Sequence, residues 1–201
     1  KEYSRDEKEM EKQFKLYLRA LDLNEENLKN KKILDLGCGP EGWFIQVCLD
    51  KNITQEAYGI DVMLPSSDLL EKKYRKHLIK DDFNKCLHVK NLDYIVSVRG
   101  VEAPQDEFDR RDPKKVLLLA LRAINKDGEI SIYPIRTLPS ENSLKSESKG
   151  LVFARKKWNE ILDELSQKEE IDYKLDPVNI QVMDGKVLWL EEILIIKNKL
   201  K

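Results

Sequence analysis

Apolar residues along the chain recur with two different spacings, and the alternation of these spacings predicts a repeated order of strands and helices. Helical spacing of apolar residues among charged ones predicts an amphipathic helix over residues 4–21. Short apolar runs bounded by polar residues predict strands over residues 33–36, 56–60, 77–80, 92–98 and 129–133. The segments between these strands predict helices over residues 42–50, 69–76 and 114–124, the last followed by a turn at residues 125–128.

The last third of the chain departs from this simple alternation. A helix over residues 153–165 would place four apolar residues on one side, namely Trp158, Ile161, Leu162 and Leu165. Two β-rich segments follow, at residues 171–183 and 186–196. The Asp184-Gly185 pair that joins them is a strong hairpin signal.

The connections between the predicted strands indicate the fold class. Most are long enough for helical crossovers, which favours strands that run parallel. The predicted fold is therefore α/β, with a doubly wound, mostly parallel sheet of seven strands that ends in an antiparallel hairpin. Residues 137–150, rich in Ser, Lys and Glu, are expected to form a mobile surface loop that is either a lid or an ordinary connection.

Length and charge limit the classes of protein to which the chain can belong. Its 201 residues fit one domain that needs neither metal nor disulfide for stability. The net charge of −1 provides no global field to attract nucleic acid or an anionic membrane. The three cysteines form no paired framework, and no apolar run reaches membrane-spanning length. The given sequence begins Lys-Glu-Tyr-Ser, without an initiator Met and without the n-region and h-region of a signal peptide. We expect a soluble cytoplasmic protein whose natural start has been trimmed.

Three glycines carry the clearest functional signal. Gly37-x-Gly39-x-x-Gly42 follows the strand over residues 33–36 and precedes a helix. Glycine lets the backbone turn tightly and approach a ligand, and a helix start presents free N–H groups and a positive dipole end. A second short strand then ends in Asp61. This setting predicts a site for a nucleotide-like ligand.

The segment from Asp35 to Asp61 resembles the class I S-adenosylmethionine-dependent methyltransferases, whose first motif has the form LDLGCGxG. The resemblance extends over residues 31–201 and implies a Rossmann-like methyltransferase domain, with residues 1–30 as a helical cap segment. It implies S-adenosylmethionine as the cofactor and S-adenosylhomocysteine as its product. The chain departs from the motif at Glu41, where family members often have a third glycine.

The resemblance also implies roles for single residues in the cofactor site. The glycine turn would face the methionyl part, Asp35 would order the turn or hold the methionyl amine, and Asp61 would bind the ribose hydroxyls. Asp82 and Phe83 would meet the adenine, with Val62 as a further apolar neighbour. Residue by residue, the implied cofactor-binding set is Asp35, Gly37, Cys38, Gly39, Asp61, Val62, Asp82, Phe83 and Ser97. From the residues alone, the alternatives are that Asp61 is an exposed acid closing a strand and that Phe83 is an ordinary core residue.

The methyl acceptor is less well defined. Residues 97–102 leave the fourth strand where ligands bind in open α/β folds, but lack the Asn/Asp-Pro-Pro-aromatic signature of enzymes that methylate adenine or glutamine nitrogens. The catalytic residues stay unassigned; Glu102 and Tyr133 are candidates by location only. Arg99, Arg110, Arg111 and Arg136 could receive a carboxylate or phosphate, although a solvated face explains each of them as well. Cys86-x-His88 supplies at most two ligands, so we predict no metal site.

The loop at residues 39–43 also resembles the PGGW loop of the FtsJ-like ribose 2′-O-methyltransferases. Those enzymes need a Lys-Asp-Lys-Glu set, whereas this chain has Ser97 and Tyr133-Pro134 at two of the corresponding places. We therefore do not predict the FtsJ-like activity. The near-zero net charge favours a small-molecule acceptor over nucleic acid, and we predict a methyltransferase of EC class 2.1.1 acting on a small molecule. A binding subunit without catalysis, an RNA or protein methyltransferase and, further off, an NAD-dependent oxidoreductase stay open as alternatives, and the sequence assigns no oligomeric state.

Overall fold

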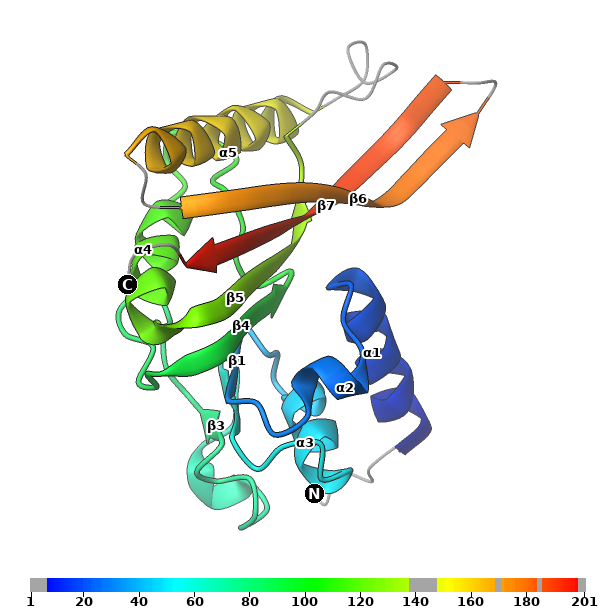
Figure 1. Cartoon of the computed structure of the whole chain (residues 1–201), viewed down its shortest axis with the longest axis vertical. Helices are drawn as coiled ribbons and strands as arrows, with labels where there is room; N and C mark the ends of the chain where they lie inside the picture. Colours follow the sequence, from blue (N-terminus) through cyan, green and yellow to red (C-terminus); the bar gives the residue numbers. More distant parts are fainter. Residues whose placement is uncertain (1–6, 138–147, 169–170, 184–185, 199–201) are drawn as a thin grey trace.

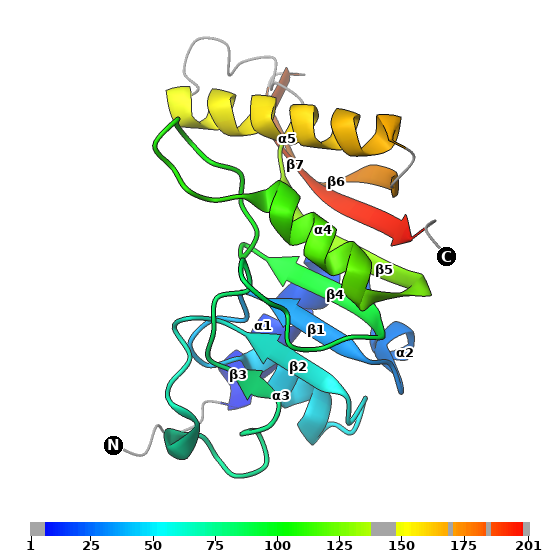
Figure 2. The same ribbon diagram turned by 90° about the vertical axis from the view of Figure 1, so that its left-hand side faces the viewer.

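The computed structural model describes residues 7–137, 148–168, 171–183 and 186–198. Within these residues the chain forms one mixed sheet between two layers of helices, with α4 and α5 on one side and α1 and α3 on the other (Figure 1). The turned view shows α4 and α5 in front of the sheet and α1 behind it (Figure 2). The strand order is β3-β2-β1-β4-β5-β7-β6.

The strands run parallel except the last. Parallel pairs join β3 to β2, β2 to β1, β1 to β4 and β4 to β5, and β7 then runs antiparallel between β5 and β6. The predicted doubly wound, mostly parallel sheet with a closing antiparallel hairpin is thus confirmed. The strands are β1 (Ile33–Leu36), β2 (Ala57–Ile60), β3 (Leu78–Ile79), β4 (Leu92–Val98), β5 (Ile124–Ile135), β6 (Ile171–Met183) and β7 (Lys186–Asn198).

Amphipathic helices cover both faces of the sheet. Leu34 and Leu36 of β1 point into the core beneath α4 and α5, whereas Ile33 points into the core beneath α1 and α3. This split follows from the alternation of side chains along a strand. Asp35 alternates with the same period, so it lies on the α1 face. The helices are α1 (Glu7–Ala20), α2 (Glu25–Leu28), α3 (Trp43–Asp50), the 3-10 turn η1 (Ser67–Leu69), α4 (Pro113–Ala123) and α5 (Lys149–Gln167).

The helix predicted over residues 69–76 is wrong. The chain there forms η1 and then a series of turns that lead into β3. Only Tyr74 is buried between residues 71 and 76, so the segment has no apolar face to pack as a helix. The Arg75 side chain instead donates hydrogen bonds to the Leu70 and Asp68 carbonyl oxygens and fixes the turns.

The turn predicted at residues 125–128 is also wrong, because these residues belong to β5. Leu92 of β4 pairs with Ile124 of β5, and the next pair is Tyr94 with Glu129. Between these two pairs the chain moves two residues along β4 but five residues along β5. The additional residues form a bulge. Within the bulge, the Asn125 side-chain amide donates hydrogen bonds to Asn91 O and Asp93 Oδ1. These bonds hold the bulge against the start of β4.

The loop predicted over residues 137–150 is shorter than expected. Ser148 caps α5 by accepting a hydrogen bond from the Leu151 N–H, and Lys149 and Gly150 belong to that helix. The rest of the predicted loop, residues 138–147, lies outside the described residues, as does the Asp184-Gly185 turn. None of the helices in the described part of the chain has the length and apolar character needed to cross a membrane.

Candidate functional site

The glycine turn lies where β1, β2 and β4 end together. Gly37, Gly39 and Gly42 all have positive φ values, of 77°, 76° and 62°. A Cβ on Gly37 would lie 2.5 Å from the Gly100 Cα, so the turn packs directly against the backbone that leaves β4. A Cβ on Gly39 would have no neighbour within 4 Å. Gly37 is therefore required for packing, and Gly39 faces open space.

Asp61 is bound to the glycine turn. Its Oδ2 accepts a hydrogen bond from the Gly39 N–H at 2.9 Å, and its Oδ1 accepts one from the Met63 N–H at 2.7 Å. Each carboxylate oxygen has a second lone pair for a further donor. The structure thus brings the acid at the end of β2 to the turn after β1, beside the open side of Gly39.

Ser97 has a different environment. Its side chain is fully buried, and its hydroxyl donates to Leu36 O at 2.7 Å and accepts from the Val101 N–H at 3.0 Å. The hydroxyl thus fastens the end of β4 to the end of β1. Ser97 therefore holds the strand that precedes the glycine turn, and a direct contact between Ser97 and a cofactor stays a prediction.

Asp35 is the most unusual group of the site. Its carboxyl group is fully buried, and neither oxygen has a hydrogen-bond partner among the described residues. Burial raises the pKa of Asp35 to about 8; the nearby Tyr17 hydroxyl opposes the rise and the charge of Asp61 adds to it. Burial likewise raises the pKa of Tyr17, which faces Asp35 from α1. A buried carboxyl group without a hydrogen-bond donor lowers the free energy of unfolding, and a ligand that donates a hydrogen bond to it would remove this cost.

Helix α1 is anchored beside this carboxyl group by aromatic contacts. The Tyr17 ring stacks on Phe44 of α3 with 4.8 Å between centroids, and the Phe14 ring stacks on the same residue at 5.6 Å. Lys51 at the end of α3 pairs with Glu11 of α1 at 3.0 Å and with Glu25 of α2 at 3.1 Å. The leading helix therefore both packs on the core and covers Asp35, while the boundary of a cap segment at residue 30 stays a prediction.

The residues predicted to meet the adenine follow β2 and β3. Val62 is 58% exposed and Met63 66%, so apolar surface is available beside Asp61. Asp82 lies within its own turn, where Oδ1 accepts from the N–H and Nδ2 of Asn84 at 2.9 and 2.8 Å. Phe83 is half-buried against the core beneath α4 and α5. These residues share the carboxyl edge of the sheet with Asp61, and their part in binding stays a prediction.

Two predicted candidates lie on the acceptor side, and both are engaged with other residues. Glu102 forms an ion pair with Arg111, which also pairs with Asp109 and holds the pKa of that carboxyl well below its usual range. The Tyr133 hydroxyl donates to the buried carboxylate of Glu191 on β7. Neither contact tests a catalytic role. Glu191 was not predicted from the sequence.

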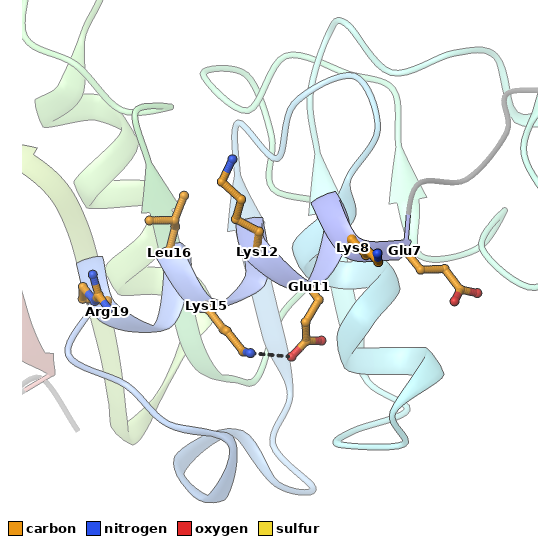
Figure 3. A pocket seen from close by; sticks show the side chains of 7 residues that line it. All are labelled: Glu7, Lys8, Glu11, Lys12, Lys15, Leu16 and Arg19. Atoms are coloured by element: carbon orange, nitrogen blue, oxygen red, sulfur yellow. Dashed lines mark ion pairs between the residues drawn. The ribbon is translucent and has the colours of Figure 1, made fainter.

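The remaining features predicted from the sequence give no separate site. His77 contacts the Ala57 carbonyl oxygen through Nδ1, and His88 contacts Asp81 through Nε2. Among the described residues no group of His, Cys, Asp or Glu has the arrangement of a metal site. A surface hollow of about 500 Å³ lies along α1 and does not include the predicted cofactor residues (Figure 3). Its lining residues are Glu7, Lys8, Glu11, Lys12, Lys15, Leu16 and Arg19.

The strand order, the glycine turn after β1 and the acid after β2 together define the Rossmann-like fold of the class I methyltransferases. No protein-family model and no curated protein matches the sequence. Among solved structures, the chain is similar to the plantazolicin methyltransferase BpumL in complex with SAH and a pentazolic desmethylPZN analog, with a TM-score of 0.53 and 16% identity. That match covers 98% of this chain and 92% of BpumL.

Two further structures share the fold. The N-methyltransferase NodS from Bradyrhizobium japonicum matches with a TM-score of 0.51 and 13% identity, over 96% of this chain and 99% of NodS. Phospholethanolamine N-methyltransferase 2 from Haemonchus contortus, in complex with phosphomonomethylethanolamine and S-adenosylhomocysteine, matches with a TM-score of 0.51 and 18% identity. That match covers 83% of this chain and 38% of the Haemonchus contortus enzyme. At these identities the similarity is one of fold.

Alanine substitutions at two glycines separate backbone conformation from close packing. Because Gly37 and Gly39 have nearly equal φ values, both changes carry the same left-handed penalty of about 1 to 2 kcal/mol. Gly37→Ala adds a clash with the Gly100 backbone, so its total loss of unfolding free energy is expected to be about 2 to 5 kcal/mol. Urea denaturation of the two variants measures the difference. Equal losses would contradict the close approach of Gly37 to Gly100.

Proposed function

We propose that the protein is a class I methyltransferase that binds S-adenosylmethionine and transfers its methyl group to a small-molecule acceptor. The observation that carries the proposal is the buried, unpartnered carboxyl group of Asp35 beside the glycine turn. A cationic amine is the donor that such a group lacks, and the methionyl end of S-adenosylmethionine carries one. The similarity of fold to solved methyltransferases supports the same conclusion.

The remaining residues of the site suit the other parts of this cofactor. Asp61 has lone pairs available for the two ribose hydroxyls, and the open side of Gly39 leaves room for the ligand backbone. Val62, Phe83 and Asp82 would surround the adenine. When bound, the cofactor supplies a methyl group that its sulfonium centre already activates. The chain then has to orient the acceptor, exclude water and receive any proton that the acceptor releases.

Ligand binding tests the proposal. S-adenosylhomocysteine at about a hundred times its dissociation constant is expected to stabilise the protein by about 2.7 kcal/mol, which thermal unfolding detects as a rise in Tm. NAD at the same concentration is the matched control and is expected to give no rise. Stabilisation by NAD alone would overturn the proposal in favour of an oxidoreductase. Binding of S-adenosylhomocysteine without methyl transfer to any acceptor would favour a non-catalytic subunit.

A further inference from the structure

A second group of polar side chains is buried at the carboxyl edge, two strands away from Asp35. The Tyr133 hydroxyl at the end of β5 donates to Glu191 Oε2, and Arg136 Nη2 lies 2.9 Å from Glu191 Oε1. The side chains of Glu191 and Arg136 are 7% and 27% exposed, so the carboxylate is buried and the guanidinium reaches the surface. A carboxylate in this position is stabilised by the positive charge and by two hydrogen bonds.

The strand register places this group on the same face of the sheet as the cofactor site. Asp35 pairs with Val96 of β4, and Val98, two residues further along, pairs with Tyr133 of β5. Val96, Val98 and Tyr133 all belong to the core beneath α1 and α3. Two strand spacings separate β1 from β5, which is about 10 Å. The Arg99 N–H also donates to Tyr133 O at 2.7 Å, so the segment that leads to Gly100 is bound to the end of β5.

The two neighbouring acids of β7 point to opposite faces. Glu191 alternates with Ile193, which belongs to the core beneath α1, and so it lies on the cofactor face. Glu192 alternates with Leu194, which belongs to the core beneath α4 and α5. Glu192 Oε2 accepts from the N–H and hydroxyl of Thr137 and fastens β7 to the end of β5. Both acids of β7 are thus bonded to residues at the end of β5, and Glu191 is the one that lies on the face of the proposed reaction.

We propose that Tyr133 and Glu191 bind an amine acceptor and take up its proton, an inference that rests on the proposed methyltransferase function. The Tyr133 oxygen accepts a hydrogen bond from the acceptor N–H while its own hydrogen is donated to Glu191. In the reaction the acceptor N–H bond breaks, the tyrosyl oxygen receives that proton, and the tyrosyl proton passes to Glu191. The sulfonium carbon–sulfur bond breaks as the nitrogen–carbon bond forms, leaving S-adenosylhomocysteine, the methylated amine and a protonated Glu191.

The charges around the group favour an amine over an acid. A carboxylate or phosphate acceptor oxygen carries no hydrogen to donate to the phenolic oxygen, and it would place a further negative charge beside the buried carboxylate of Glu191. Arg136 is paired with Glu191 and acts as a positioning residue that orients the carboxylate. A nitrogen that carries a hydrogen satisfies the phenolic oxygen without adding negative charge.

The cofactor analogue sinefungin tests the placement without knowledge of the acceptor. Sinefungin carries an amino-bearing carbon in place of the methylated sulfonium, so its amine marks the position of the transferred methyl group, and S-adenosylhomocysteine lacks that amine. We expect Tyr133→Phe and Glu191→Gln each to weaken sinefungin binding about tenfold or more while S-adenosylhomocysteine binding changes less than about twofold. Isothermal titration calorimetry gives both dissociation constants for each full-length variant.

Glu192→Gln is the matched control, because it alters the adjacent buried acid on the opposite face. It is expected to leave the ratio of the two dissociation constants unchanged. An unchanged ratio in Tyr133→Phe or in Glu191→Gln would overturn the assignment while leaving cofactor binding intact. If wild-type protein binds neither ligand, the proposed function itself fails. Glu191→Gln keeps the shape of the side chain, so it provides the test if Tyr133→Phe does not fold.

Discussion

Replacing Asp35 by asparagine is expected to stabilise the fold and to weaken cofactor binding at the same time. The buried carboxyl group has no hydrogen-bond partner in the described structure, and its ionised form is unfavourable there. Asparagine has nearly the same shape and carries no charge. At pH 7 we expect Asp35→Asn to raise the unfolding free energy by about 2 to 4 kcal/mol. We also expect its affinity for S-adenosylmethionine to fall at least about tenfold, because the methionyl amine loses its charged acceptor.

The stability difference is expected to depend on pH in a definite direction. The pKa of Asp35 rises from an ordinary 3.8 to about 8 on folding, so the folded state holds a proton that the unfolded state has released. The stabilisation from that proton is fully present below pH 4 and is lost as pH rises through 8. The two proteins should therefore differ little at pH 4 and increasingly towards pH 8. Urea denaturation at a series of pH values measures this, and a constant difference would contradict the raised pKa.

The cofactor affinity of the wild-type protein should increase as pH rises, whereas the stability contributed by the Asp35 proton decreases. An amine binds to ionised Asp35, so wild-type protein should bind S-adenosylhomocysteine more tightly by about tenfold or more at pH 8 than at pH 6. Asp35→Asn should lose most of this dependence and serves as the control for titration of the ligand itself. Calorimetry at the two pH values measures both. Equal pH dependence in the two proteins would show that Asp35 is not the titrating group.

Removing Asp61 is expected to give the second large effect. Asp61→Ala removes the acceptor proposed for the ribose hydroxyls, so we expect affinity for S-adenosylmethionine to fall by about tenfold to a hundredfold. It also removes the acceptor of the Gly39 and Met63 N–H groups, so the unfolding free energy should fall by about 1 to 3 kcal/mol with the fold retained. Calorimetry and circular dichroism measure the two quantities.

Two comparisons separate these effects of Asp61. Asp61→Asn keeps one oxygen, which can accept from one of the two backbone N–H groups, and loses the charge, so its loss of affinity should persist while its loss of stability is no larger than that of Asp61→Ala. Asp163→Ala removes an exposed acid of α5 and should change neither quantity. Unchanged cofactor affinity in Asp61→Ala would place the ribose elsewhere.

The sequence correctly predicted the elements that have a long apolar pattern or clear turn residues at their ends. Three elements lie within a few residues of their predicted bounds: the amphipathic helix α1, the strand β4 and the two strands of the closing hairpin. The helix over residues 69–76 failed because its charged residues form no apolar face, and side-chain contacts from Arg75 decide the conformation. The turn at residues 125–128 failed because these residues continue β5, where the Asn125 amide is bonded to Asn91 and Asp93 at the start of β4, a contact that local composition does not reveal.

The cofactor side of the site was more predictable than the acceptor side for a physical reason. Gly37, Gly39 and Asp61 lie on consecutive strand ends, so the order of elements already brings them together. Tyr17 and Glu191 reach the site only through the docking of α1 and the pairing of β7 with β5. Tyr17 lies within the helix predicted over residues 4–21, but helical spacing alone predicts no contact between it and Asp35. Alternation with Ile193 could have marked Glu191 as an acid on a buried face.

The place of β1 in the middle of the sheet has a consequence for how the protein is made. When the ribosome has released residues 33–60, β1 and β2 can pair, but the other edge of β1 waits for β4. Until then Leu34 and Leu36 lack the core that covers them. The glycine turn likewise lacks Gly100, against which it packs. A nascent chain of this length thus exposes apolar side chains. The segment after β4 brings Gly100 to the glycine turn, whereas Leu34 and Leu36 are covered only when α4 and α5 have followed.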